Sequence, residues 1–200
     1  MRLGLVSDIH ASYGSLSRAF DILADRRVDR VACTGDIVQK GADGEAVVQL
    51  LRSQWVICVQ GNHDANAVRR AREEGDFDGL SPDSIEWLAN LPLERAYEWE
   101  GVRVVLAHMA PCGVDAYVWP DDIPKRLKRA LRNTEHDVIV LGHTHVPMKV
   151  RCLDSCLVNP GSVRGTKTRD SHTCGVLSLP SLELEILSLE DGQPVEYAGD

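Results

Sequence analysis

Short apolar runs alternate with longer amphipathic stretches along the first half of the chain. An apolar run bounded by turn residues predicts a buried strand, and apolar positions three to four residues apart predict a helix. Strands and helices are therefore expected in alternation over Leu3–Val6, Leu16–Ala24, Val28–Cys33, Glu45–Leu51, Trp55–Val59 and Ala65–Glu74. This alternation favours parallel strands joined by right-handed crossovers.

The second half of the chain is richer in strands. Ser81-Pro82-Asp83 combines a cap residue, a proline at the first helical position and an acid, and it predicts a helix that ends near Leu91. Paired strands over Arg95–Glu98 and Val102–Ala107 and a basic amphipathic helix over Pro124–Arg132 are expected next. Further strands are predicted over Val138–Leu141, Met148–Arg151, Cys156–Val158, Cys174–Leu179 and Leu182–Leu187.

These elements predict an α/β fold with two mixed sheets. We expect one domain over residues 1–200, arranged as a four-layer αββα sandwich in which helices flank the two sheets. The carboxyl ends of the strands in such a fold gather at one edge, where ligands bind. A metal site is therefore predicted at this edge if suitable side chains follow the strands.

The composition narrows the classes of function. Lys and Arg total 22 and Asp and Glu total 30, so the formal net charge is −8. Proteins that grip a nucleic-acid backbone are usually basic, so stable nucleic-acid binding is not expected. No apolar run approaches the roughly 20 residues that span a bilayer, and the first strand begins almost at residue 1. We predict a cytoplasmic protein with no membrane contact, and we expect the six cysteines to be reduced and buried.

Polar clusters follow the ends of five predicted strands. They contain Asp8 and His10, Asp36, Asn62 and His63, His108, and His143 and His145. A single Asp-x-His or Gly-Asp pair occurs often without function, whereas five such clusters in succession favour a shared site. Their carboxylate, imidazole and amide groups form a mixed nitrogen and oxygen donor set that suits Mn, Fe, Zn or Ni.

The order of the clusters resembles a known family. The calcineurin-like metallophosphoesterases carry the same motifs in the same order: Asp-x-His, Gly-Asp, Gly-Asn-His-Asp, His and Gly-His-x-His. Asn159-Pro160-Gly161-Ser162-Val163 further resembles the small prokaryotic phosphodiesterase branch of that superfamily, and Arg169-Asp170 fits a motif that often follows it. The match runs from Asp8 to about Asp170, which is most of the chain.

The resemblance implies a cofactor and a reaction. The cofactor would be two divalent metal ions, with Mn²⁺ as the first expectation and Fe, Ni or Zn as alternatives. One ion would be held by Asp8, His10, Asp36 and His145, and the other by Asp36, Asn62, His108 and His143. His63 would be the leaving-group acid while a metal-activated hydroxide attacks a small phosphate ester. The sequence leaves homo-oligomer formation open.

Two positions depart from the protein-phosphatase pattern of the family. That pattern reads Gly-Asp-x-x-Asp-Arg-Gly, and this chain has Gln39 and Lys40 where it has the second Asp and the Arg. Lysine lacks the bidentate fork of arginine, and a phosphate monoester dianion gains most from such clamps. A phosphodiester is therefore the favoured substrate. The alternatives are a phosphomonoesterase on small molecules or proteins and a catalytically weak metal-binding scaffold.

Further residues near the predicted site are each open to two interpretations. Met109 stands where relatives usually carry glycine, so its side chain either narrows the site or packs. Pro111–Asp122 is expected to form a loop over the rim, and its aromatic residues either stack on a nucleoside base or anchor the loop. Arg164, Lys167 and Arg169 are candidate phosphate contacts, although charged loop residues are usually only solvated.

Overall fold

The first β-sheet of the computed structural model contains the amino-terminal strands. The structure describes residues 1–39, 42–114, 116–132, 134–165 and 171–199. The sheet has the order β10-β9-β1-β2-β3. Its strands are β1 (Arg2–Val6), β2 (Arg30–Cys33), β3 (Ile57–Cys58), β9 (Thr173–Ser178) and β10 (Glu183–Ser188). β1, β2 and β3 are parallel, whereas β9 runs antiparallel to both β1 and β10, so the sheet is mixed.

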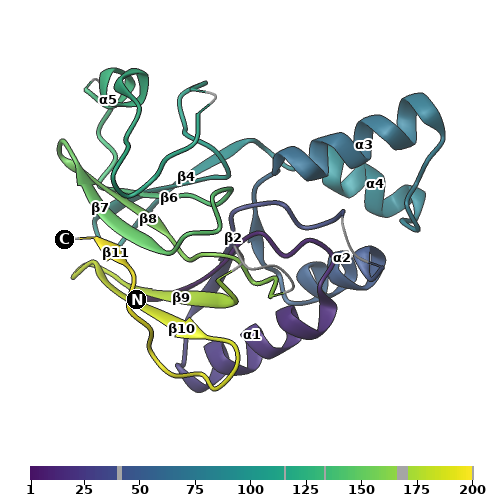
Figure 1. Cartoon of the computed structure of the whole chain (residues 1–200), viewed down its shortest axis with the longest axis horizontal. Coiled ribbons are helices and arrows are strands. Elements are labelled where there is room, and N and C mark those ends of the chain that lie inside the picture. The colour runs from purple at the N-terminus through teal and green to yellow at the C-terminus, as the bar shows by residue number, and fades with distance from the viewer. Residues whose placement is uncertain (40–41, 115, 133, 166–170, 200) are drawn as a thin grey trace.

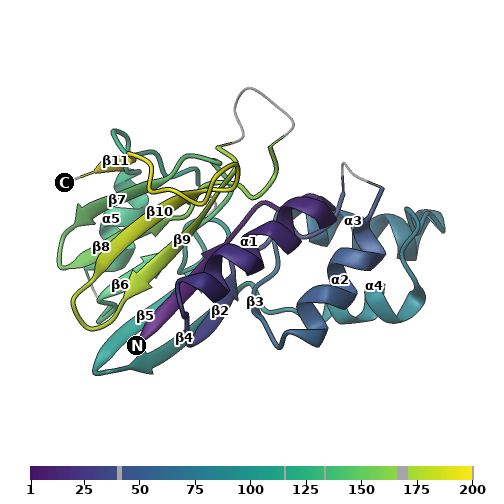
Figure 2. The same cartoon turned by 90° about the horizontal axis from the view of Figure 1, so that it is seen from below.

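Two helices connect the parallel strands and cover the outer face of this sheet (Figures 1 and 2). They are α1 (Tyr13–Asp25), between β1 and β2, and α2 (Gly44–Ser53), between β2 and β3. α1 buries Leu16 and Leu23, and α2 buries Val47 and Leu51, which is the predicted helical spacing. Their apolar stripes face the sheet because burial there removes these side chains from water.

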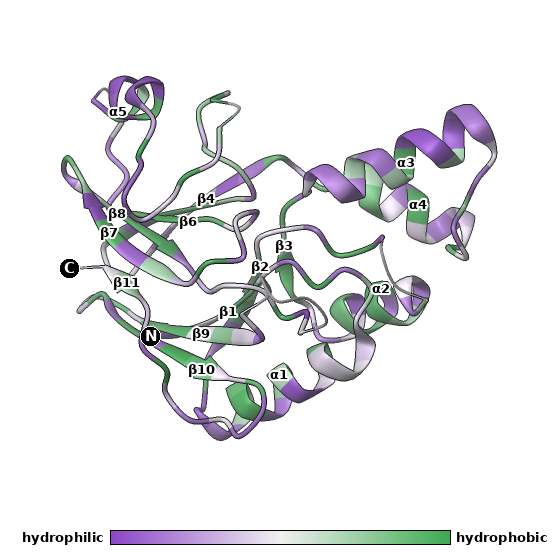
Figure 3. Cartoon of the chain, viewed as in Figure 1, coloured by the Kyte–Doolittle hydropathy of each residue, from purple (hydrophilic) through white to green (hydrophobic). Residues whose placement is uncertain are grey.

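A pair of helices, α3 (Asn62–Glu74) and α4 (Pro82–Ala89), extends from the end of β3. α4 begins as predicted: Ser81 Oγ accepts a hydrogen bond of 3.1 Å from the N–H of Ser84, and Pro82 is the first helical residue. The outer surface of α3 is hydrophilic, whereas the central strands are largely hydrophobic (Figure 3). The charged helix predicted in this region is therefore a solvated one.

The second sheet has the order β11-β7-β8-β6-β5-β4. Its strands are β4 (Glu94–Trp99), β5 (Val102–Ala107), β6 (Val138–Val140), β7 (Met148–Cys152), β8 (Ser155–Asn159) and β11 (Ala198–Gly199). β4 and β5 form the predicted antiparallel hairpin, β5, β6 and β8 are parallel, and β7 is antiparallel to β8. α5 (Lys125–Leu131) lies on the outer face of this sheet and buries Leu127 and Leu131.

Three apolar clusters join these layers. The first packs α1 to α4 against the first sheet. The second fills the space between the two sheets, where Leu3 and Leu5 of β1 meet Val104 of β5 and Val138 of β6. The third packs α5 against Ile139 of the second sheet. The predicted four-layer αββα arrangement of two mixed sheets is confirmed.

The structure corrects three details of the sequence prediction. α3 begins at Asn62 and not near Ala65, so the Asn-His-Asp segment forms the first helical turn rather than a loop. Trp55 is 91% exposed and has a φ of 53°, so it lies in a turn before β3. Cys112 is exposed, unlike the other cysteines. Lys40, Lys167, Arg169 and Asp170 lie outside the described residues. Within the described part of the chain, no helix combines the length and apolar content needed to cross a bilayer.

Candidate metal centre

The predicted site residues converge from both sheets. Asp8 and His10 follow β1, Asp36 follows β2, and Asn62 and His63 begin α3 directly after β3. His108 follows β5, and His143 and His145 follow β6 of the second sheet. The rim is therefore formed by the carboxyl ends of strands from two packed sheets. Three sets of donor atoms each lie within 4.8 Å of one another: Asp8, His10 and His145; His10, Asp36 and His63; and Asp36, His108 and His143.

Asp36 lies at the centre of the group. Its Oδ1 accepts a hydrogen bond of 2.8 Å from the backbone N–H of His63. Its Oδ2 lies 3.2 Å from His108 Nε2 and 3.8 Å from His10 Nε2. Burial alone would raise the pKa of the Asp36 carboxyl, but the surrounding imidazoles hold it well below its usual range. One oxygen of the ionised carboxylate thus anchors the side chain, and the other lies near both His108 and His10.

The two oxygens of Asp8 also have separate roles, one as an anchor and one facing the imidazoles. Its Oδ2 accepts hydrogen bonds of 2.6 Å from Ser7 Oγ and 3.0 Å from the backbone N–H of His143. Its Oδ1 lies 3.1 Å from His145 Nε2. Although burial would raise the pKa of Asp8, the hydrogen bond with His145 and the nearby His108 hold it below its usual value. Both aspartates are therefore ionised at neutral pH.

The imidazole of His108 is oriented by the backbone. Its Nδ1 donates to the carbonyl of Thr34 at 2.7 Å, which directs Nε2 into the site. Nε2 lies 3.0 Å from Asn62 Oδ1 and 3.2 Å from His143 Nδ1. Burial would lower the pKa of His108, but Asp36 raises it to about 9 in the metal-free protein. Burial and His108 lower the pKa of His143 to about 4, so the His143 ring is neutral at pH 7.

This donor set fits divalent cations. His10 Nε2 and His145 Nε2 approach to 3.3 Å, and His143 Nδ1 and His108 Nε2 to 3.2 Å. With a cation bound, the nitrogens of each pair would ligate it as neutral imidazoles. Nε2 of His143 is buried without a hydrogen-bond partner among the described residues. Two carboxylates with neutral imidazoles and an amide are ligands that borderline divalent metals accept.

The turns that carry these residues have an uncommon backbone conformation. Positive φ angles occur at Asp8 (52°), His10 (47°), Asp36 (53°), His143 (71°) and His145 (61°). Non-glycine residues rarely adopt this region, although Asp and His do so more often than most others. Backbone strain of this kind clusters at functional sites, where the surrounding contacts hold it.

His63 lies beside the donor group, in the first turn of α3. Its Nε2 is 4.0 Å from Asp36 Oδ2, and its side chain is 24% exposed. Its Nδ1 contacts Gln39 Oε1, which can only accept a hydrogen bond, so Nδ1 carries a proton. Gln39 replaces the carboxylate of the protein-phosphatase pattern, yet the structure shows that it still orients this ring. The difference is that the partner of His63 is neutral.

Asp64 is a supporting residue that the sequence analysis did not assign. It is fully buried, and its Oδ1 accepts hydrogen bonds of 2.8 Å and 3.0 Å from the N–H groups of Ile37 and Val38. Its Oδ2 accepts a bond of 2.9 Å from the N–H of Gly61, completing the cap of α3. Burial and the Asp36 charge raise the pKa of Asp64 to about 7. The acid three residues after Gly61 was the available signal, because that is the spacing of a capping box.

The Asn159 to Val163 motif also supports the site. Asn159 Nδ2 donates to the carbonyl of Gly142 at 2.7 Å and so holds the turn that carries His143. Ser162 Oγ donates to the carbonyl of Asp8 at 3.0 Å. The motif therefore holds the turns that carry His143 and Asp8 by hydrogen bonds to their backbone carbonyls. Its sequence alone did not indicate this role.

The loop over the rim is also close to the donor group. The ring of Tyr117 lies 4.2 Å from the ring of His143, centre to centre. Tyr117 and Trp119 are parallel to within 7°, and both are partly exposed. The backbone N–H of Arg164 donates to the carbonyl of Asp8 at 3.3 Å. These contacts place the loop and Arg164 at the site, while their roles toward a substrate stay predictions.

Known proteins of similar sequence and structure were compared with the chain. The family model for the calcineurin-like phosphoesterase superfamily domain matches residues 1–181. Phosphodiesterase MJ0936 of Methanocaldococcus jannaschii is 25% identical over 196 residues, covering 95% of this chain and 100% of that protein. The uncharacterized protein MJ0912 of the same organism is 25% identical over 160 residues, covering 72% of this chain and 63% of its own length. The crystal structure of a metallophosphoesterase from Sphaerobacter thermophilus gives a TM-score of 0.74 at 22% identity, covering 98% of this chain and 89% of that one.

Proposed function

The chain belongs to the calcineurin-like phosphoesterase superfamily, and from this premise we propose that it is a metal-dependent phosphodiesterase that hydrolyses small phosphodiesters. The observation that carries the proposal is the position of Asp36 Oδ2, within 3.8 Å of imidazole nitrogens of His108 and His10. Asp36 would therefore be available as a ligand to both metal ions. A relative named as a phosphodiesterase matches along 95% of the chain, which supports the same reaction.

Two sets of residues would hold the metal ions. Asp8, His10, Asp36 and His145 would bind one ion, and Asp36, Asn62, His108 and His143 would bind the other. When bound, two divalent ions lower the pKa of the attacking water and stabilise the charge of the phosphate. Divalent ions are characteristic of the family; Mn²⁺ is the ion we propose for this chain, with Fe, Ni or Zn as alternatives.

His63 would protonate the leaving group. Its partly exposed ring faces the site through Nε2, whereas Nδ1 is engaged by Gln39. Because the contact with Gln39 fixes the ring plane, Nε2 is directed at one position beside Asp36. As an imidazolium, with Nε2 protonated in addition to Nδ1, His63 would donate the Nε2 proton to the departing alkoxide, which typically accelerates a reaction by ~10²–10⁴-fold.

The sequence beside Gln39 supports a diester over a monoester. Two divalent ions would exceed the charge of Asp8 and Asp36 by about two units, which attracts a phosphate anion. Lys40 stands where the protein-phosphatase pattern has an arginine, and lysine lacks the bidentate fork of that residue. A monoester dianion gains more from such cationic contacts than a diester monoanion does. The replacement of arginine by Lys40 therefore supports phosphodiester hydrolysis.

Parallel hydrolysis assays test the proposal. Bis-p-nitrophenyl phosphate and p-nitrophenyl phosphate are offered to protein that has been stripped with EDTA and reloaded with Mn²⁺, Ni²⁺, Fe²⁺ or Zn²⁺. The expected result is metal-dependent turnover that favours the diester and is lost in Asp36→Asn. Asp21→Asn, at an acid of α1 that is not part of the donor group, is the matched control and is expected to keep wild-type turnover.

Each alternative has its own outcome in this experiment. Preference for the monoester would assign a phosphomonoesterase. Metal binding without turnover of either compound would assign a metal-binding scaffold and overturn the proposed activity.

A further inference from the structure

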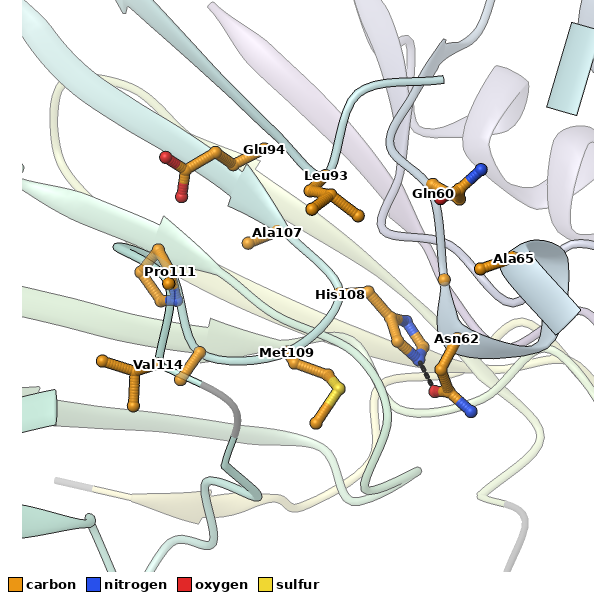
Figure 4. Close-up of a pocket in the computed structure, with 13 residues that line it drawn as sticks. Gln60, Asn62, Ala65, Leu93, Glu94, Ala107, His108, Met109, Pro111 and Val114 are labelled. Atoms are coloured by element: carbon orange, nitrogen blue, oxygen red, sulfur yellow. Dashed lines mark hydrogen bonds between the residues drawn. The ribbon is translucent and has the colours of Figure 1, made fainter. Parts of the chain in front are cut away.

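A cavity of about 680 Å³ opens directly beside the candidate metal centre. Asn62 and His108 form its inner end, so the residues proposed to hold the second metal ion also line the cavity (Figure 4). Its volume lies in the range of small-molecule sites, which is roughly 300–1,000 Å³. A phosphate bound at the metals would therefore have a substituent at this end of the cavity.

The walls of the cavity are mainly apolar. Those walls are formed by Ala65, Leu93, Ala107, Met109, Ala110, Pro111 and Val114. Met109 supplies a flexible thioether side chain, and such a side chain adapts to the shape of a bound group. The apolar walls of the cavity thus extend to within one residue of His108.

Each polar side chain that lines the cavity makes a contact within the protein. Gln60 Nε2 donates to the carbonyl of Leu88 at 2.8 Å, and Asn62 Oδ1 lies 3.0 Å from His108 Nε2. Glu94 Oε2 accepts a bond of 3.0 Å from the N–H of Cys112. The Glu94 carboxylate lies at the end of the cavity away from Asn62 and His108 (Figure 4). No Lys or Arg is among the described residues that line this cavity.

These features define the chemistry of the occupant. A second phosphate or a carboxylate would meet Glu94 without a compensating cation. A sugar would leave its hydroxyl groups facing apolar walls, which costs free energy for each unpaired group. An uncharged apolar ring or chain would instead be removed from water without leaving polar groups unpaired.

The position of His63 indicates which part of the ester enters the cavity. His63 is not among the residues that line the cavity, and its ring packs edge-on against His10, which does not line the cavity either, with ring centres 5.0 Å apart. The group that departs must lie next to the acid that protonates it. The cavity therefore lies beside the ester group that remains on phosphorus.

We propose that this cavity is a specificity site that binds the retained, uncharged apolar group of a phosphodiester substrate. The proposal rests on the phosphodiesterase function argued above and names the class of substrate: diesters in which the alcohol that remains on the phosphate carries an apolar ring or chain. It makes Leu93, Met109 and Val114 determinants of substrate choice, not of the chemical step.

A pair of diesters with the same leaving group tests the proposal. Methyl p-nitrophenyl phosphate and benzyl p-nitrophenyl phosphate both release p-nitrophenolate and differ only in the retained group. The benzyl ester is expected to have a kcat/KM higher by about 10- to 100-fold, since apolar pockets discriminate added carbon atoms by such factors. The 2-carboxyethyl ester, which is longer than the methyl ester but charged, is expected to be no better than the methyl ester.

Leu93→Ser is the diagnostic variant. Leu93 is 72% exposed, so serine is tolerated by the fold while the cavity loses part of its apolar wall. The ratio of the benzyl to the methyl kcat/KM is expected to fall by about tenfold. Leu153→Ser is the matched control, because Leu153 is also exposed (46%) and lies in the β7–β8 turn, not in the cavity wall. It is expected to leave the ratio unchanged.

Ligand binding gives a readout that does not need turnover. Calorimetry compares monomethyl benzylphosphonate with monomethyl methylphosphonate on the Mn²⁺-loaded protein and on both variants. We expect tighter binding of the benzyl compound, by about tenfold or more, and loss of this difference in Leu93→Ser. Equal affinities, or a ratio that both serine variants change equally, would overturn the cavity proposal even if diesters are hydrolysed. Absence of diester turnover with a persisting benzyl preference would overturn the proposed reaction and keep the binding site.

Discussion

Gly61 lies where two turns of the candidate metal centre come closer than a side chain permits. A Cβ atom at this position would overlap both the backbone nitrogen and Oδ1 of Asp36. The φ angle of Gly61 is −91°, a value that any residue adopts. The cost of Gly61→Ala is therefore steric, and the overlap is relieved only if Asp36 or the start of α3 moves.

The structure sets the size of this effect. Moving Asp36 breaks its bond of 2.8 Å with the N–H of His63, a bond to a charged acceptor that is worth about 1.5–3 kcal/mol. The accompanying backbone shift in a packed region costs about 1–3 kcal/mol. We therefore expect the free energy of unfolding to fall by about 3–6 kcal/mol in the metal-free protein.

The same movement disturbs the donor atoms. Asp36 Oδ2 lies 3.2 Å from His108 Nε2 and 3.8 Å from His10 Nε2. A shift of about 1 Å in a reacting geometry commonly costs ~10²-fold in rate. Turnover of bis-p-nitrophenyl phosphate is expected to fall at least that far, and the binding of Mn²⁺ is expected to weaken.

Urea unfolding followed by circular dichroism, with Mn²⁺ calorimetry and diester assays, measures these changes. Gly14→Ala is the control, because Gly14 lies in α1 and a Cβ atom there meets nothing within 4 Å. This control is expected to gain about 0.5–1 kcal/mol of stability and to keep full activity. The reasoning is refuted if Gly61→Ala unfolds within about 0.5 kcal/mol of wild type and keeps its Mn²⁺ affinity and turnover.

Three further predictions concern charges and hydrogen bonds at the same centre. Burial lowers the pKa of His108 but Asp36 raises it to about 9 in the metal-free fold, above 6.5. The free energy of unfolding gains up to ~3 kcal/mol from this interaction below pH 6.5, and the gain is lost as the pH rises through 9. Urea titrations in EDTA at several pH values measure it, and a free energy of unfolding that does not change over this pH range contradicts it. Gln39→Ala removes the partner of His63 Nδ1 and is expected to lower kcat by about tenfold or more with unchanged Mn²⁺ affinity, so a matching loss of affinity in calorimetry would contradict an orienting role. Asp64→Ala leaves three buried N–H groups unpaired and is expected to destabilise the fold by about 3–5 kcal/mol in thermal unfolding, and Asp64→Asn by less; the opposite order would refute the assignment.

Local periodicity was sufficient to predict most of the helices and strands. The apolar spacing that predicts a helix over Leu16–Ala24 is a property of the segment itself, and α1 buries that stripe. The start of α3 was missed because Asn62 and His63 resemble loop residues, although Asp64 caps the helix through the N–H of Gly61 at the spacing of a capping box. Asp64 also accepts hydrogen bonds from the distant Ile37 and Val38, and a local pattern does not contain these tertiary contacts.

The residues of the candidate site were predictable from the sequence, but the sheets that carry them and their hydrogen bonds were not. Parallel strands followed by polar clusters predicted a common rim, yet nothing in the order of the clusters showed that β5 and β6 belong to a second sheet. The sequence showed that Gln39 replaces the second aspartate of the protein-phosphatase pattern, but it did not show that the amide oxygen contacts the His63 ring. The residue type shows that the side chain at position 39 is uncharged. Whether its amide oxygen reaches the His63 ring, as a carboxylate would, depends on the fold.

The backbone at the site also explains why asparagine is the informative replacement for its aspartates. Asp8 and Asp36 have φ angles of 52° and 53°, a region that costs a β-branched or apolar residue more than it costs Asp or Asn. Alanine at Asp36 would remove the charge, the bond to His63 and the tolerance for this conformation together, so a loss of activity would have three causes. Asparagine keeps the shape, an oxygen for the N–H of His63 and the local backbone preference, and it replaces the other oxygen and the charge by a neutral NH₂ group. A loss of metal binding in Asp36→Asn without a loss of fold therefore reports on the carboxylate as a ligand, which alanine does not.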